Sequence, residues 1–241
     1  MSERLLKGIA ALASAFALAG CGENEPEAET APAPGGGEEL VLVVSGEAPP
    51  YSYIDDDGSI VGLEVDIAKA AAAALGRTLV TRKLEFEDLL PALRDGLADM
   101  AASGLTITEG RRKTVDFTDS YATEGGAFLY RTGEPVPTMI RAEQLRMGTV
   151  DSMTLDFYLT RHGIDAIRYR SCAAAIQDVL DGKIDALFYD SCSLKADAEK
   201  FGGRLSVSKL ETREPYGIAV RKGCPELMAA LNAAIAERVS K

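Results

Sequence analysis

Residues 101–113 read AASGLTITEGRRK. The opening Ala-Ala-Ser indicates the end of a buried strand, and Gly104 indicates a tight turn directly after it. Thr108 is a favourable N-cap for the helix that follows. The start of a helix holds free N–H donors, and an arginine beside it offers a bidentate fork to a carboxylate. Gly104, Thr106 and Arg111 are therefore predicted to form one half of a carboxylate-binding site.

The composition excludes several classes of function. The chain has 241 residues, which is enough for one or two domains, and a formal net charge of −11. Nucleic acid is not expected as a partner, because binding phosphates requires clustered lysine and arginine. The single histidine, His162, excludes zinc sites of the His-Glu-x-x-His type. We expect neither a metal nor a cofactor.

The first residues are typical of export and membrane anchoring. A basic start precedes the apolar run 8–17, which is too short to span a bilayer comfortably and predicts a signal peptide over residues 1–20. The sequence Leu18-Ala19-Gly20-Cys21 resembles the cleavage pattern of bacterial lipoproteins. This implies lipid on Cys21 and a location in the periplasm or at the cell surface; a signal peptide with an incidental cysteine is the alternative.

A linker is predicted after the signal peptide. Residues 21–39 begin with the cysteine and are rich in Pro, Gly and Ala, with six Glu and no basic residue. Such a composition predicts a disordered acidic segment, so part of the net charge belongs to the linker. Three further cysteines, Cys172, Cys192 and Cys224, lack C-x-x-C spacing and allow at most one intramolecular disulfide, whose pair the sequence does not select.

The rest of the chain is predicted to be α/β, in two similar lobes. The pattern helix, glycine, aspartate, buried strand occurs over residues 93–103 and again over residues 180–189. Residues 51–61 predict a hairpin with an Asp-Gly turn. Apolar runs predict strands at 40–45, 79–83, 100–103, 147–150 and 186–189, and periodic segments predict helices at 66–75, 86–95 and 154–161.

Ligands of open α/β sheets bind beyond the carboxyl ends of the strands. Ser103-Gly104 end one predicted strand and Asp190 ends another. If the two lobes face each other, both ends line one cleft. Asp151-Ser152 precede the helix 154–161, which places a further helix N-terminus in the same zone.

This order of motifs resembles the bacterial extracellular solute-binding protein family 3, the polar amino acid-binding proteins of ABC importers. The resemblance covers roughly residues 40–241. It rests on Pro50-Tyr51-Ser52-Tyr53, Gly62-Leu63-Glu64-Val65-Asp66-Ile67-Ala68, Leu90-Pro91-Ala92-Leu93, Gly104-Leu105-Thr106-Ile107-Thr108-Glu109-Gly110-Arg111, Val115-Asp116-Phe117, Asp185-Ala186-Leu187-Phe188-Tyr189-Asp190 and Tyr216-Gly217-Ile218-Ala219-Val220.

The resemblance implies an α/β, two-lobed periplasmic binding protein-like fold of type II. Two strands would cross between the lobes, near residues 121–126 and 212–217. Lobe 1 would then span residues 40–121 together with 217–241, and lobe 2 residues 126–212. A hinge between the lobes would close them on the ligand.

The resemblance also implies roles for single residues. Arg111 would grip the α-carboxylate of the ligand. Thr106 would give its N–H to that carboxylate and its hydroxyl to the α-ammonium, and Gly104 would offer its carbonyl to the ammonium. Asp190 would pair with the ammonium from lobe 2, and Phe86 would form an aromatic wall over the ligand side chain.

Three departures from the family pattern bear on the ligand. The usual second aromatic near Ala48 is missing, so Glu47, Tyr51 or nothing fills that wall. The position that is acidic in members with basic ligands is Ser45, which makes a strongly cationic ligand less expected unless Glu47 substitutes. The usual Gly-Thr or Gly-Ser pair of lobe 2 is replaced by Asp151-Ser152. Ser45, Tyr51 and Ser152 are nevertheless candidate ligand contacts.

The resemblance predicts a monomeric, lipid-anchored, extracytoplasmic substrate-binding protein. It would capture an amino acid or similar small zwitterion and deliver it to an ABC permease in the inner membrane, without chemistry on the ligand. A ligand sensor that signals to a membrane receptor is the alternative. A third possibility is an enzyme that resembles cyclohexadienyl dehydratases, with Glu47, Glu124 and Asp151 as candidate acids; the sequence shows no nucleophile–base pair.

Overall fold

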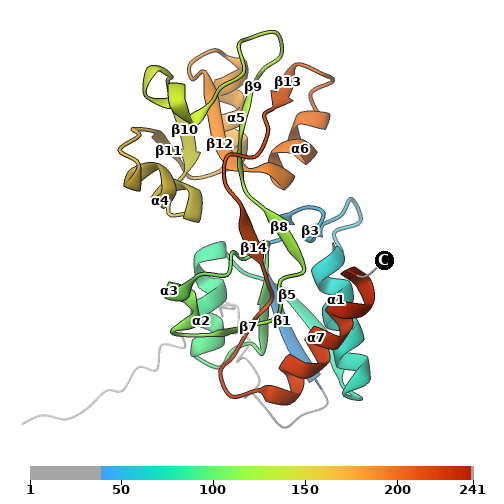
Figure 1. Cartoon of the computed structure of the whole chain (residues 1–241). Helices are drawn as coiled ribbons and strands as arrows, with labels where there is room; N and C mark the ends of the chain where they lie inside the picture. Colours follow the sequence, from blue (N-terminus) through green and yellow to red (C-terminus); the bar gives the residue numbers. More distant parts are fainter. Residues whose placement is uncertain (1–38, 240–241) are drawn as a thin grey trace, which may run out of the picture. The chain divides into compact units, whose positions relative to one another are not determined.

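The structure is a computed structural model of the chain, and it describes residues 39–239 (Figure 1). The predicted signal peptide, the predicted lipid attachment at Cys21 and nearly all of the predicted linker lie outside these residues. Within the described part of the chain, no helix has the length and apolar character needed to cross a membrane.

The first lobe is built on a five-stranded sheet with the order β5-β1-β6-β15-β7. The three strands nearest the N-terminus run parallel, whereas β15 arrives from the end of the chain and pairs antiparallel with both its neighbours. The strands are β1 (Glu39–Val44), β5 (Thr78–Lys83), β6 (Met100–Ala102), β7 (Asp116–Phe117) and β15 (Ala219–Val220).

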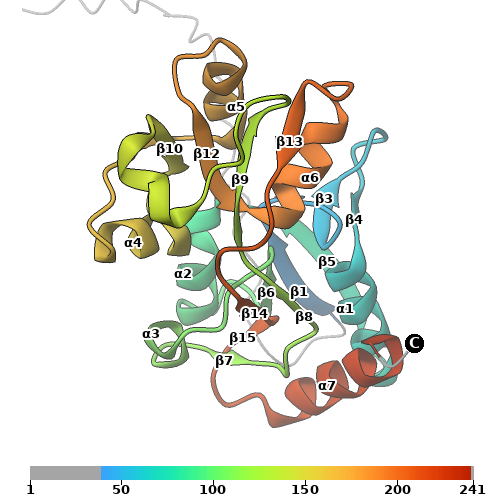
Figure 2. The ribbon, with the colours of Figure 1, turned by 45° about the horizontal axis from the view of Figure 1, so that its top comes forward.

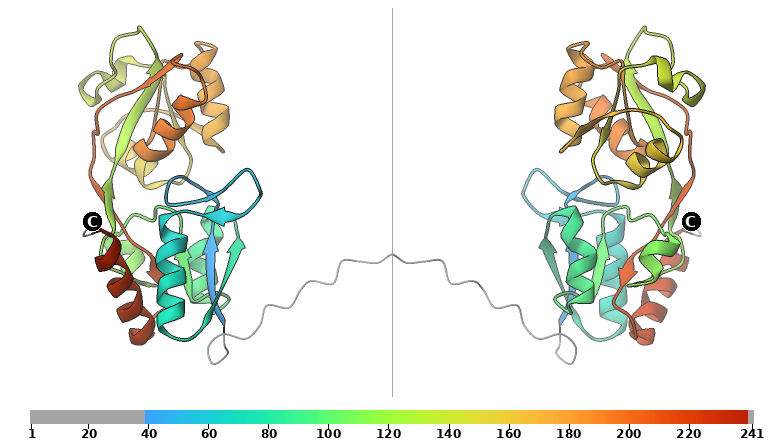
Figure 3. Two further views of the ribbon diagram at one scale, coloured as in Figure 1. Left: turned by 90° about the vertical axis from the view of Figure 1, so that its right-hand side faces the viewer. Right: turned by 90° about the vertical axis from the view of Figure 1, so that its left-hand side faces the viewer.

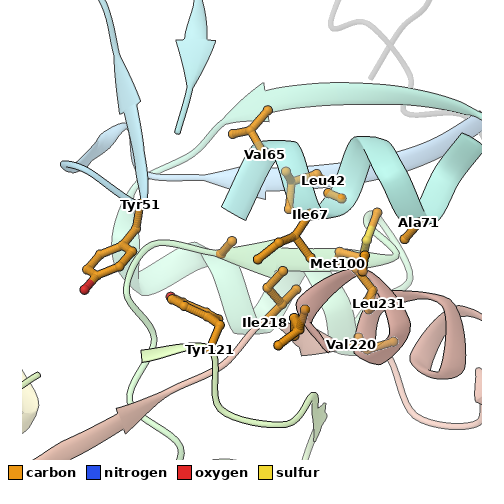
Figure 4. Close-up of a cluster of buried hydrophobic side chains, with 14 of the residues drawn as sticks. Leu42, Tyr51, Val65, Ile67, Ala71, Met100, Tyr121, Ile218, Val220 and Leu231 are labelled. Carbon is orange, nitrogen blue, oxygen red and sulfur yellow. The ribbon is translucent and has the colours of Figure 1, made fainter. Parts of the chain in front are cut away.

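Helices cover both faces of this sheet. Side chains of a strand alternate between its faces, so Leu42 packs towards α1 (Leu63–Ala74) and α7 (Pro225–Val239), and Val43 packs towards α2 (Leu89–Arg94). Figure 4 shows the first of these two clusters. Each fully buried aliphatic side chain of this kind contributes about 1.5–3 kcal/mol of transfer free energy. The continuous apolar run of β1 is therefore explained by burial on two faces.

The second lobe holds another five-stranded sheet, with the order β11-β10-β12-β9-β13 (Figure 2). Its strands are β9 (Gly126–Arg131), β10 (Met147–Val150), β11 (Ile167–Tyr169), β12 (Ala186–Asp190) and β13 (Leu205–Val207). One face packs on α5 (Cys172–Leu180) and α6 (Ser191–Glu199), and the other on α4 (Thr154–Arg161).

Two strands carry the chain between the lobes (Figure 3). They are β8 (Ala122–Glu124) and β14 (Glu214–Tyr216), which pair antiparallel with each other so that Glu124 lies opposite Glu214. This is the predicted α/β arrangement of two lobes and two crossing strands.

Short elements complete the first lobe. The Asp-Gly hairpin forms as predicted within a three-stranded sheet of β2 (Glu47–Ala48), β3 (Ser52–Ile54) and β4 (Ile60–Val61). The remaining elements are η1 (Phe86–Asp88), α3 (Glu109–Arg112) and, in the second lobe, η2 (Met139–Gln144).

The first helix differs from its prediction, because α1 begins at Leu63 and not at Asp66. Gly62 precedes it with φ +123°, and a Cβ there would lie 2.3 Å from the carbonyl oxygen of Tyr51. The backbone N–H of Glu64 donates to that same oxygen at 2.9 Å. The close approach of two segments thus sets the start of the helix, and the hydrophobic period does not reveal it.

Candidate ligand-binding site

A cavity of about 750 Å³ is lined by residues of both lobes. The carboxyl ends of β1 and β6 reach it from the first lobe, and the end of β12 reaches it from the second, as expected for open α/β sheets. Six of the eight ligand contacts predicted from the sequence line this cavity: Ser45, Phe86, Gly104, Thr106, Arg111 and Asp190.

Arg111 is held in place by its own loop. The Thr108 hydroxyl accepts a hydrogen bond from the Arg111 N–H at 3.1 Å and caps α3 as predicted, while the guanidinium donates to the Thr106 carbonyl at 2.9 Å. Burial lowers the pKa of Arg111, and the acidic Glu214 and Asp190 oppose that change. Within residues 39–239, no carboxylate lies within ion-pair distance of Arg111. A partly desolvated cation of this kind suits an anionic ligand group.

The backbone of Gly104 is hydrogen-bonded to the buried carboxyl group of Glu64, which the sequence analysis did not single out. Its N–H donates to Glu64 at 3.2 Å, and Glu64 also accepts from the hydroxyls of Ser52 and Tyr121. Burial raises the pKa of Glu64, and these hydrogen bonds oppose the rise. Gly104 has φ +60°, and a Cβ there would lie 3.1 Å from the Tyr216 ring. Glycine therefore meets both a backbone and a space requirement at this position.

Ser45 and Phe86 form further parts of the first lobe's wall. The Ser45 N–H donates to the Ser103 hydroxyl at 2.7 Å, and the two hydroxyls lie 3.0 Å apart. The half-buried Phe86 lies beneath the Arg111 guanidinium, 5.8 Å from the ring centroid. Where a second aromatic was expected, Glu47, Ala48 and Pro49 line the cavity.

Asp190 brings the second lobe's charge to the cavity. It occupies the N-cap position of α6, but its side chain makes no capping bond and instead accepts from the Tyr216 hydroxyl at 2.6 Å. Burial raises the pKa of Asp190 to about 7, with Glu214 and Glu124 adding to the rise and the Tyr216 bond and Arg111 opposing it. A ligand ammonium beside this carboxyl would favour its charged form.

Ser152 lies in an adjoining cavity of about 630 Å³, which shares Phe86 and Arg111 with the first. Its backbone has φ +60°, and its N–H donates to Asp156 at 3.2 Å. Asp151 lines this second cavity as well, and so does Arg170, which the sequence analysis did not single out.

Tyr51 is placed differently from the other candidates. It does not line the cavity but is 6% exposed, with its ring centroid 5.5 Å from that of Tyr121 and 5.7 Å from that of Tyr216. Its hydroxyl donates to Glu124 at 2.7 Å, and Glu124 also accepts from Ser191 at 2.7 Å. Tyr51 therefore belongs to the packing where the crossing strands join the first lobe, and it does not replace the missing aromatic wall.

Glu214 on β14 is a further residue that the sequence analysis missed. It accepts a hydrogen bond from the Thr106 hydroxyl at 2.7 Å. An acidic residue next to Pro215 on a short segment has no local signal that separates it from a solvated one. In the described part of the chain, no group of acidic, cysteine or histidine side chains is arranged to hold a metal, and Cys172, Cys192 and Cys224 are free thiols.

A cavity between two α/β lobes, with a half-buried arginine on one side and a half-buried aspartate on the other, defines a two-lobed binding protein for small solutes. The chain belongs to the bacterial extracellular solute-binding proteins, family 3, whose model matches residues 40–241. The family and the fold predicted from the sequence are thus confirmed, and so is a binding protein in place of an enzyme.

Two curated relatives match most of this chain in sequence, and a solved structure shares its fold. The chain is 34% identical to the L-arginine-binding protein of Pseudomonas aeruginosa over 201 residues, covering 78% of this chain and 77% of that protein. It is 31% identical to the probable histidine-binding protein of Neisseria gonorrhoeae, covering 94% and 87%. The arginine-bound, truncated ArgBP of T. maritima superposes with a TM-score of 0.75 at 31% identity, covering 83% of this chain and 96% of that one.

Proposed function

We propose that the protein captures an amino acid, or a similar small zwitterion, between its lobes and delivers it to an ABC importer. The observation that carries this proposal is that Arg111 and Asp190, two half-buried ionisable groups of opposite charge, line one cavity. A zwitterion satisfies both charges at once, whereas a simple anion or cation leaves one of them desolvated and unpaired. Relatives named for arginine and histidine binding support the same class of ligand.

In this proposal the ligand carboxylate binds Arg111 and the N–H of Thr106. The ligand ammonium binds Asp190, the Thr106 hydroxyl and the Gly104 carbonyl. Phe86 and Ser45 contact the ligand side chain, and Ser152 approaches the carboxylate from the second lobe when the lobes close.

The segments outside the lobes extend the proposal to the cell envelope. Residues 1–20 act as a signal peptide, Cys21 carries lipid, and residues up to 39 tether the binding part to a membrane. The binding part divides into residues 40–121 with 217–241 and residues 126–212, so that β8 and β14 form the hinge. The lipoprotein pattern at Leu18-Ala19-Gly20-Cys21 supports the anchor.

Thermal unfolding with a panel of L-amino acids tests the ligand class, using protein that carries Cys21→Ala so that no lipid is present. A ligand at about 1,000 times its dissociation constant stabilises by about 4 kcal/mol, or roughly 8–16 °C for a protein of this size. We expect at least one L-amino acid to give such a shift, and the same ligand at the same concentration to give a clearly smaller shift with Arg111→Ala. The absence of a shift across all twenty would overturn the proposal.

Metabolic labelling with an alkyne fatty acid tests the anchor separately. We expect label on the wild-type protein in the membrane fraction and neither label nor membrane retention for Cys21→Ala. Label that persists in the variant would place the lipid elsewhere, and a lack of label on both would remove the anchor while leaving the ligand proposal intact.

A further inference from the structure

The crossing strand β14 is joined directly to the loop that carries Thr106. Thr106 and Tyr216 form a backbone bridge, the Ile107 N–H donates to the Pro215 carbonyl at 2.8 Å, and the Gly217 N–H donates to the Leu105 carbonyl at 3.1 Å. The loop therefore keeps a fixed position relative to β14.

Two side chains on the same side of β14 each form a hydrogen bond with one residue that lines the cavity. Glu214 and Tyr216 are two positions apart, so they point to the same side of the strand. Glu214 accepts from the Thr106 hydroxyl at 2.7 Å, and Tyr216 donates to Asp190 at 2.6 Å. Glu214 itself does not line the cavity. Any effect of its hydrogen bond on a ligand is therefore transmitted through Thr106.

The direction of that hydrogen bond decides what Thr106 offers to a ligand. A hydroxyl has one proton and two lone pairs. The Thr106 hydroxyl donates its hydrogen bond to Glu214. The Thr154 hydroxyl, 3.3 Å away on the other lobe, is therefore the donor in its contact with Thr106. One lone pair of the Thr106 oxygen remains, and it can be satisfied only by a donor in the cavity.

We propose that Glu214 is a positioning residue that keeps the Thr106 hydroxyl as an acceptor and thereby selects ligands that carry an ammonium group. The inference rests on the proposed amino acid ligand and adds a determinant of its recognition. Without Glu214, the Thr106 hydroxyl rotates freely and donates to a cavity oxygen or water as readily as it accepts.

Calorimetric titration of two matched ligands tests the inference in the Cys21→Ala protein. The probes are L-arginine and 5-guanidinopentanoate, which lacks only the α-amino group, followed by the same pair for any other L-amino acid that the thermal screen selects. The quantity of interest is the ratio of the two affinities. For Glu214→Leu we expect this ratio to fall about 10- to 100-fold, the value of one hydrogen bond to a charged group, with the affinity for the deamino ligand nearly unchanged.

The conservative variant Glu214→Gln separates the hydrogen bond from the charge. Its amide oxygen still accepts the Thr106 proton, so we expect it to retain most of the ratio, whereas a purely electrostatic role predicts the same loss as for leucine. The double variant of Glu214→Leu with Thr106→Val should lose no more than the larger single loss. Glu211→Leu, which removes a charge three residues away, should leave the ratio unchanged.

The outcomes distinguish this inference from the proposed function. Wild-type protein that binds no L-amino acid would overturn both. Two other outcomes would overturn the inference alone, provided that the wild-type protein prefers the amino acid to its deamino analogue. One is that Glu214→Leu keeps this preference. The other is that the losses of Glu214→Leu and Thr106→Val add up in the double variant. If Glu214→Leu does not fold, Thr106→Ser must keep the ratio and Thr106→Val must lose it; equal ratios in these two would also overturn the inference.

Discussion

The two lobes hold their halves of the site in different ways. In the first lobe, Gly104 is bonded to Glu64, and Thr106 is bonded to both Arg111 and Glu214. In the second lobe, the Asp151-Ser152 turn is exposed, and its backbone is held by the Asp151 N–H, which donates to the Tyr169 carbonyl at 2.9 Å, and by the Ser152 N–H, which donates to Asp156 of α4 at 3.2 Å. The first lobe thus presents a preorganised surface, which lowers the entropic cost of binding, whereas the exposed side chains of Asp151 and Ser152 in the second lobe can adjust to the bound ligand.

The largest expected effect comes from removing the cation of the first lobe. Arg111→Ala should weaken binding of the selected amino acid by about 2–5 kcal/mol, because a desolvated charge pair loses one partner. Titration calorimetry measures this loss, with the exposed Lys113→Ala on the same loop as control. If Arg111→Ala binds as tightly as the wild type, Arg111 is not a ligand contact.

The carboxyl group of Asp190 in the second lobe should make both ligand affinity and stability depend on pH. Since Asp190 has a pKa of about 7 without ligand, affinity for an ammonium ligand should fall about tenfold per pH unit below that value. The unliganded protein should respond in the opposite sense. A carboxyl whose pKa is raised on folding adds stability fully below its unfolded pKa, about 4, and loses that contribution as the pH rises through about 7.

Melting curves and titrations between pH 4.5 and 8 measure both trends. Asp190→Asn should remove the contribution of the Asp190 carboxyl group to both pH trends. The variant should bind the ligand with a low affinity that no longer changes around pH 7. If the variant keeps the wild-type pH profile of binding, another group titrates there.

Gly104→Ala is expected to lower the free energy of unfolding by a smaller amount. The left-handed backbone costs about 1–2 kcal/mol for a residue with a Cβ, and the contact with the Tyr216 ring adds to it. Gly163→Ala in the second lobe is the matched control, because Gly163 has φ +71° and open space around it. Equal losses of unfolding free energy in urea would show that the Tyr216 contact contributes nothing.

The smallest effect should come from the Asp151-Ser152 turn. Asp151→Asn removes an exposed negative charge that lines the same cavity as Arg111. Binding of a carboxylate ligand should tighten, by less than about 1 kcal/mol because exposed charges are screened. Weaker binding would mean that Asp151 contacts a cationic group of the ligand and that the second lobe's turn also contributes to selectivity.

The sequence was informative wherever local pattern and local chemistry coincide. The strand–turn–helix pattern at Gly104 to Arg111 requires a glycine, a capping threonine and an arginine within a few residues, so it is legible from the chain alone. Glu64, by contrast, looks like an ordinary acidic residue in the first turn of a helix. Its buried carboxyl group accepts a hydrogen bond from Tyr121, which lies 57 residues away in the chain.

Tyr51 is a second residue whose role depends on a distant partner in the chain. Its position in the sequence suits a wall of the site, but a partner 73 residues away, Glu124, turns its hydroxyl towards the crossing strands. Long-range pairs between tyrosine hydroxyls and carboxyl groups leave no periodic trace. The sequence could therefore name the residues around the cavity more readily than the residues that support them.

The position of β15 in the first sheet has a consequence for the order of events during synthesis. This strand inserts between β6 and β7, although more than a hundred residues, including the whole second sheet, are made before it. Domains generally fold as units during synthesis, the N-terminal one first. All the strands of the second sheet precede β15 in the chain, so the second sheet has all its strands while the first still has a gap. The first lobe to begin is therefore the last to finish, and a truncated chain that lacks residues 217–239 would retain one finished lobe and one open sheet.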